Sequence, residues 1–249
     1  MDEETGLRFS TILRSAESLR RDGFRCAYSH IIDCDSADEG LFVPPAGTTS
    51  FCITQVSHIL PLALGNVDKT TEWEKEAVAS IWYALYRYFP GLKNKIGPES
   101  LNQYQNLITL ELGVYDLYKG HMLAFNPLYG RVSDLRSQDI PHHFDLYLTS
   151  ASQPNMYAIK HLWMYRPRVQ PPRGHREVMT LVSSDNHFPL AEPEFFRVHY
   201  QIAKILQLTG IRQRFHAELN AFKYDPGHLS PDGSTDVGAI LHRRLLVNI

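Results

Sequence analysis

Short runs of β-forming residues alternate along the chain with two long helical stripes, and this pattern constrains the fold more than any other feature. The first stripe covers 71–88, where apolar side chains recur at helical spacing, and Thr71 with Glu74 makes a capping box. The second stripe covers 194–208 and ends before Gly210. With 43% apolar residues the chain can bury a sizeable core. The sequence therefore predicts a single domain, 1–249, of the α+β class.

Breaker residues and apolar spacing also predict shorter elements between and around the stripes. An amphipathic helix is expected over 7–22, and a helix that follows the stretch 106–110 is expected to stop at Gly120. The acidic stretch 33–40 is expected to be a loop. Strands are expected over 24–32, 49–59, 106–110 (strand or turn), 121–126, 145–149 and 156–165, and C-terminal helices over 211–222 and 232–246.

Charge and cysteine content bear on partners and location. The formal net charge of -2 weighs against phosphate binding, which usually needs a basic excess, although a local basic patch can still form. The three cysteines, Cys26, Cys34 and Cys52, form no CxxC pair and are expected to be reduced thiols. The acidic N-terminus has no secretory pattern, and no apolar run approaches the roughly 20 residues of a bilayer span. We therefore expect an intracellular protein, cytoplasmic or nuclear, that is not bound to a membrane. The sequence does not determine its oligomeric state.

Two short motifs stand 48 residues apart, measured from His58 to Asn106: SHILP at 57–61 and NLITL at 106–110. FNP follows at 125–127, and further matches follow at 199–210 and 232–235. In this order the motifs resemble those of the fungal-type HNH endonuclease domain. The resemblance covers roughly residues 20 to 246. It implies an HNH-like ββα core over 22–128, with added helices and strands, and a family-type C-terminal extension over 129–249 that packs on the core.

The resemblance also implies roles for individual residues. In HNH nucleases a strand histidine, here His58, deprotonates the attacking water, and a divalent metal stabilises the leaving oxygen. Asn106 would hold the loop through side-chain to backbone hydrogen bonds. The family's metal-binding histidine falls nine positions after this asparagine, where the chain has Tyr115. A neutral phenol is a poor ligand for a divalent ion, whereas a neutral imidazole is a good one. His58 and His121 remain as candidate metal ligands.

Three functions of different classes stay open at this point. The favoured one is an HNH scaffold repurposed for metal-independent acid-base catalysis on a small organic molecule, as in natural-product biosynthesis, with no cofactor. In it His58 and Tyr115 are the reacting pair and Asn106 supports them. The second is a DNA endonuclease that uses Mg²⁺, Mn²⁺, Ni²⁺ or Zn²⁺, and the third is an inactive HNH-like binding module. The first is favoured because the general base is kept while the metal position and a basic charge balance are not.

Overall fold

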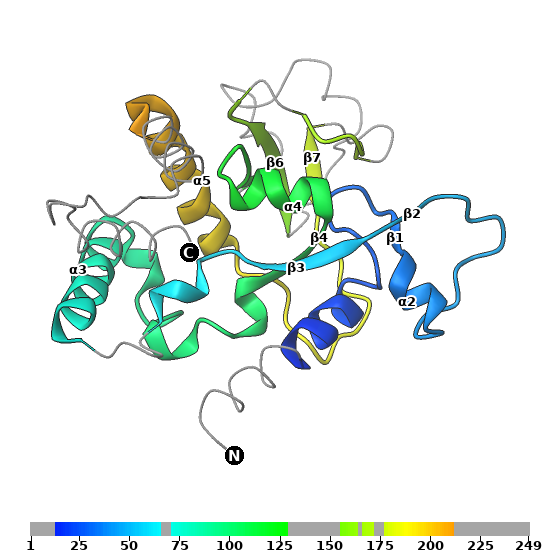
Figure 1. Ribbon diagram of the computed structural model, residues 1–249, viewed down its shortest axis with the longest axis horizontal. Coiled ribbons are helices and arrows are strands. Elements are labelled where there is room, and N and C mark those ends of the chain that lie inside the picture. The colour runs from blue at the N-terminus through cyan, green and yellow to red at the C-terminus, as the bar shows by residue number, and fades with distance from the viewer. Residues whose placement is uncertain (1–12, 66–70, 129–154, 164–165, 172–176, 212–249) are drawn as a thin grey trace, which may run out of the picture. The chain divides into compact units, whose positions relative to one another are not determined.

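The structure is a computed structural model that describes residues 13–65, 71–128, 155–163, 166–171 and 177–211 (Figure 1). The chain forms two compact units, Met1–Ala203 and Lys204–Ile249. Its mixture of helices and small sheets is α+β, as the sequence predicts. The predicted strand 145–149 and helix 232–246 lie outside the described residues, as does the helix 211–222 beyond its first residue. The single domain, the core 22–128 and the extension 129–249 stay predictions.

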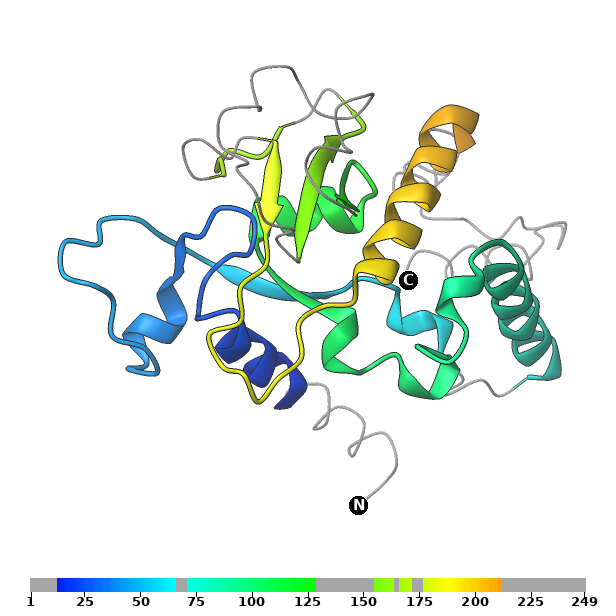
Figure 2. The ribbon, with the colours of Figure 1, turned by 180° about the vertical axis from the view of Figure 1, so that it is seen from behind.

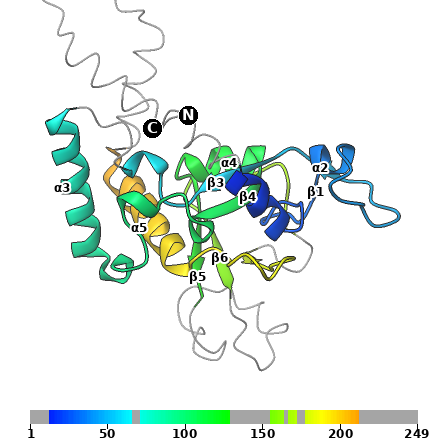
Figure 3. The same ribbon diagram turned by 90° about the horizontal axis from the view of Figure 1, so that it is seen from below.

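Seven short strands form three separate sheets among the described residues. β3 and β4 pair antiparallel, β1 and β2 pair parallel, and β5, β6 and β7 form an antiparallel sheet, with β5 beside β6 in Figure 3. The strands are β1 (Ile32–Asp33), β2 (Phe51–Cys52), β3 (Thr54–His58), β4 (Leu107–Glu111), β5 (Leu123–Pro127), β6 (Met156–His161) and β7 (Val178–Thr180). The helices are a helical segment at 13–21, α2 (Cys34–Asp38), α3 (Glu72–Tyr88), α4 (Leu112–Lys119) and α5 (Pro193–Thr209).

The two predicted long helices are confirmed as α3 and α5, each 17 residues long. At the start of α3 the Thr71 backbone N–H donates to the Glu74 carboxylate over 3.1 Å, which supplies the predicted capping box. Gly120 ends α4, as expected, and its N–H donates to the Asp116 carbonyl over 2.9 Å. Among the described residues, every helix is too short or too polar to cross a lipid bilayer.

Two predictions in the first part of the chain are wrong. The stretch 24–31 is a tight turn rather than a strand, because Phe24 and His30 both adopt the left-handed region, with φ of 54° and 60°, and of the predicted strand only Ile32 belongs to one, β1. Cys26 N–H donates to the Ile31 carbonyl and closes this turn. The acidic stretch 33–40 contains the helix α2 rather than only a loop. Asp33 caps it, since its side chain accepts from the Ser36 N–H over 2.9 Å.

An aromatic core joins α4, the sheet β5-β6-β7 and α5. Tyr118 of α4 stacks on Phe125 of β5 with ring centres 5.2 Å apart, and Phe125 meets Phe196 of α5 edge-on at 6.0 Å. All three side chains are almost fully buried, and such pairs stabilise a fold beyond the area they bury. β5 precedes residue 128 and pairs with β6 after it, so one sheet links both sides of the boundary predicted there.

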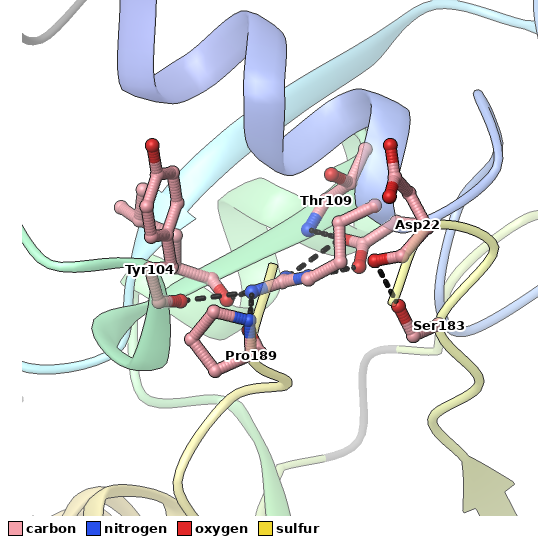
Figure 4. A network of polar contacts seen from close by, with 8 residues as sticks. Asp22, Tyr104, Thr109, Ser183 and Pro189 are labelled. Atoms are coloured by element: carbon pink, nitrogen blue, oxygen red, sulfur yellow. Dashed lines mark hydrogen bonds and ion pairs between the residues drawn. The ribbon is translucent and has the colours of Figure 1, made fainter. Parts of the chain in front are cut away.

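A buried ion pair closes the edge of β4 that faces away from β3. Asp22 accepts the Thr109 backbone N–H over 3.0 Å, while the Arg21 guanidinium donates to the Leu107 carbonyl over 2.9 Å. The guanidinium also donates to the carbonyls of Tyr104 and Pro189, which surround it with Asp22 and Thr109 in Figure 4. Figure 2 shows the segment that carries Pro189 beside the helix at 13–21. These side chains therefore take the place of a neighbouring strand.

Candidate functional site

β3 and β4 form an antiparallel strand pair, called the hairpin below although a long segment joins its strands, and α4 follows β4 directly. His58 pairs with Leu107 and Ser57 with Ile108, so alternation along the strands turns the Ser57 and His58 side chains to opposite faces. Ile108 belongs to the same buried cluster as Val114 of α4. Ser57 therefore shares a face of the strand pair with the buried Ile108, and His58 lies on the opposite face.

Asn106 ties the end of β3 to the segment that leads into β4. Its side-chain amide donates to the Leu60 and Leu101 carbonyls, both over 2.9 Å, and its oxygen accepts the Leu60 N–H over 2.8 Å. The Asn106 carbonyl also accepts the Ile59 N–H over 2.8 Å. The side chain is fully buried and its polar atoms are satisfied. The side-chain to backbone hydrogen bonds expected of Asn106 are confirmed.

His58 is the last residue of β3 and is partly buried. Its Nε2 atom lies 3.2 Å from the Asn102 side-chain oxygen. Burial lowers the pKa of the His58 imidazole below its ordinary 6.5, and the hydrogen bond with Asn102 opposes this shift without cancelling it. The ring is therefore mainly neutral at neutral pH, which is the form that can accept a proton. Sequence reasoning missed Asn102, since it belongs to none of the motifs and shows no pattern of its own.

Tyr115 lies on α4, partly buried, where it packs against the main apolar cluster. The Lys119 ammonium group lies 5.9 Å from the centre of its ring. Among the described residues, no hydrogen bond or ring contact joins Tyr115 to His58. The structure thus brings His58 together with Asn102 and the loop held by Asn106. The role of Tyr115 as partner of His58 stays a prediction.

His121 follows α4 in the left-handed region, with φ of 55°, and stacks on His199 of α5. The two ring centres are 4.7 Å apart, and the other side of the stack is Tyr118, whose ring centre lies 4.0 Å from that of His199. His58 and His121 therefore have different partners. Among the described residues, no three His, Cys, Asp or Glu side chains gather in a group that could hold a metal ion. His199 could have been found from the sequence, because it falls within the predicted apolar stripe of α5.

A second aspartate, Asp33, closes the outer edge of β3. It bonds to Thr54, the first residue of the strand, whereas His58 is the last. The Asp33 carboxylate accepts the Thr54 backbone N–H over 2.9 Å and the Thr54 hydroxyl over 2.7 Å, and it also accepts from Ser36. Burial raises the pKa of the Asp33 carboxyl, but these hydrogen bonds outweigh burial and hold it below the ordinary 3.8. Asp22 binds the outer edge of β4 in the same way, so a buried carboxylate closes each outer edge of the hairpin.

The candidate site thus consists of one neutral imidazole with one amide partner, on a hairpin held at both edges and at its connecting loop. This arrangement can accept a proton, bind a polar group or present a nitrogen ligand. Searches against protein-family models, curated proteins and solved structures find no match for this chain.

Proposed function

We propose that this chain is an acid-base enzyme in which the His58 imidazole removes a proton from a small organic molecule. Its scaffold is an HNH-like ββα unit made of β3, β4 and α4, with helices and strands added around it. The single observation that carries the proposal is the partly buried His58 ring with its Asn102 hydrogen bond. A general base must be unprotonated at working pH and fixed in place, and His58 has both properties.

Metal-independent chemistry is supported by Tyr115, which stands at the helix position where the resemblance implies a metal-binding histidine. A neutral phenol is a poor ligand for a divalent ion. A small substrate, rather than DNA, is supported by the formal net charge of -2. His58 as base therefore acts without a cofactor in this proposal.

A reaction that needs only proton removal tests the role of His58. 5-Nitrobenzisoxazole opens to a coloured phenolate when a base takes its ring C–H proton, so absorbance reports the rate in protein treated with a chelator. We expect the rate to rise with pH and to level off by neutral pH, with a midpoint below 6.5 because burial lowers the pKa of His58. His58→Gln should slow the reaction by about 100-fold or more.

The matched control is His187→Gln, since the His187 side chain is 90% exposed and pairs with Asp185. It should keep the full rate. Plasmid DNA with Mg²⁺, Mn²⁺, Ni²⁺ or Zn²⁺ provides the opposing measurement. Cleavage that His58→Gln abolishes would establish the endonuclease alternative instead. If His58→Gln changes neither proton removal nor cleavage, the chain is a binding module.

Tyr115 is proposed as the acid that protonates the leaving group, and a pair of probes isolates this role. Unsubstituted benzisoxazole releases a more basic phenolate than the nitro compound. The rate of its ring opening therefore depends more on an acid that protonates the leaving oxygen. Tyr115→Phe removes only the hydroxyl and should slow the unsubstituted compound about tenfold while leaving the nitro compound nearly unchanged. If Tyr115→Phe changes the rates of both compounds by the same factor, Tyr115 is not the acid and His58 remains as the base alone.

A further inference from the structure

The partner of His58 decides which of its two ring nitrogens is free to react. The Asn102 side-chain oxygen, 3.2 Å from His58 Nε2, carries no proton and can only accept a hydrogen bond. Nε2 must therefore carry the proton, and in the neutral ring the lone pair then resides on Nδ1. We propose that Asn102 is a positioning residue that fixes His58 in this tautomer, so that Nδ1 is the atom that takes the substrate proton. This inference rests on the function proposed for His58.

The fold places Asn102 for this task through its neighbour. Asn106 donates to the Leu101 carbonyl over 2.9 Å and to the Leu60 carbonyl over the same distance, so the segment before β4 is fastened to the residues that follow β3. Leu101 itself is almost fully buried in the main apolar cluster. The residue after this fixed point is Asn102, and its amide reaches the ring at the end of β3. Asn106 thus holds the backbone, and Asn102 holds the imidazole.

In the proposed step, protons and electrons are conserved between the probe and the His58 ring. The substrate C–H proton passes to Nδ1, the C–H electron pair forms the new multiple bond in the probe, and the N–O bond breaks to give the phenolate. The imidazolium then carries protons on both nitrogens, and Nε2–H keeps its hydrogen bond to the Asn102 oxygen throughout. Water takes the Nδ1 proton in the next step. The amide therefore orients the base in both of its protonation states.

Replacing Asn102 by aspartate tests the contact, because a carboxylate at this place still accepts from Nε2 and adds a negative charge. We expect Asn102→Asp to raise the pKa of His58 by about one unit or more. Nitrogen-15 NMR of the ring, assigned with His58→Gln, gives both the pKa and the tautomer. The control is Gln103→Glu, which adds the same charge one residue further on and gives up only the exposed hydrogen bond that the Gln103 amide donates to the Lys95 carbonyl. It should shift the pKa of His58 much less.

A third variant, Asn102→Ala, removes the oxygen that accepts the Nε2 proton of His58. In the wild-type protein we expect a ring proton on Nε2 that exchanges slowly with water, lost in Asn102→Ala and restored in Asn102→Asp. A proton found on Nδ1 in the wild type, or equal pKa shifts in Asn102→Asp and Gln103→Glu, would overturn the inference. These NMR measurements need no turnover. A ring that behaves as expected in a protein without probe activity would refute the proposed function alone, whereas an active protein with an unmoved ring would refute only the role of Asn102.

Discussion

The outer edges of the β3-β4 hairpin and the aromatic face of α4 are both buried, yet they are held by different kinds of contact. At the edges, Asp22, Arg21 and Asp33 carry charge into the interior, and each has several hydrogen-bond partners. On the aromatic face, the Tyr118 hydroxyl and the His199 Nδ1 are buried without a hydrogen-bond partner among the described residues. One region is held by directed polar contacts and the other by ring stacking.

The difference shows where the chain needs position and where it needs only packing. An unpaired strand edge exposes backbone groups that must be satisfied, so charged side chains become useful there despite the cost of burial. The hairpin that these contacts fix also carries His58. Ring stacking around His199 fills space and leaves two polar atoms unused, which lowers stability there. We therefore expect substitutions at the strand edges to lower the stability of the protein strongly, and a substitution in the ring stack to raise it.

The largest effect is expected from Asp22→Ala, which removes the carboxylate that pairs with Arg21 and accepts from Thr109 N–H. It leaves a buried, uncompensated guanidinium, and we expect the free energy of unfolding to fall by about 3–5 kcal/mol in urea titrations. Glu72→Ala is the control, because the Glu72 side chain is 84% exposed in its pair with Lys75 and should change stability by less than about 1 kcal/mol. The double variant Arg21→Met with Asp22→Leu should lose at least as much, because it also removes the donor to the carbonyls of Tyr104, Leu107 and Pro189. A double variant that loses less would show that the unpaired charge, and not the lost hydrogen bonds, sets the cost of Asp22→Ala.

A smaller loss is expected from Asp33→Asn, since an amide keeps one acceptor oxygen for contacts that now use both. We expect a loss of about 2 kcal/mol at neutral pH. Because the pKa of Asp33 is lowered on folding, its contribution is fully present above 3.8 and is lost as pH falls below that value. Urea titrations from pH 3 to 7 should therefore show the variant approaching the wild type in acid. Asp35→Asn, exposed in the same helix, should show no such convergence.

The smallest effect, and the one of opposite sign, is expected from His199→Phe. Burial, together with the neighbouring His121, lowers the pKa of His199 well below 6.5, while a hydrogen bond to the Tyr118 backbone opposes this. The neutral ring therefore supports the fold above pH 6.5, and this support is lost as pH falls below that value. Phenylalanine keeps the stack and removes the unsatisfied nitrogen, so stability should stay equal or rise by up to about 1 kcal/mol.

The pH dependence distinguishes this effect from a change in packing. Thermal unfolding between pH 5 and 8 should show a smaller loss in acid for His199→Phe than for the wild type. His187→Gln, in an exposed position, should not reduce the acid loss in this way. A His199→Phe protein that is less stable at every pH would mean that the hydrogen bond of the imidazole to the Tyr118 backbone outweighs the unsatisfied nitrogen.

The sequence was informative where a structure depends on residues close together in the chain. The apolar spacing of α3 and α5 and the capping box at Thr71 depend on neighbours within one or two turns, and they were predicted. The strand 24–32 was mispredicted, because a β-like composition does not reveal the left-handed backbone at Phe24 and His30. Asn102 was not predicted, since its contact with His58 crosses 44 residues.

By itself, the sequence determined the α+β class and the places of the long helices α3 and α5, while the side-chain to backbone hydrogen bonds of Asn106 were implied by the family resemblance. Only the tertiary structure decided that Arg21, which reads as the polar end of an exposed helix, is completely buried. It likewise decided that His58 meets Asn102. The physical reason is that local spacing fixes which backbone bonds form within an element, whereas the fate of a charge or an imidazole depends on carbonyls and amides brought to it from distant segments.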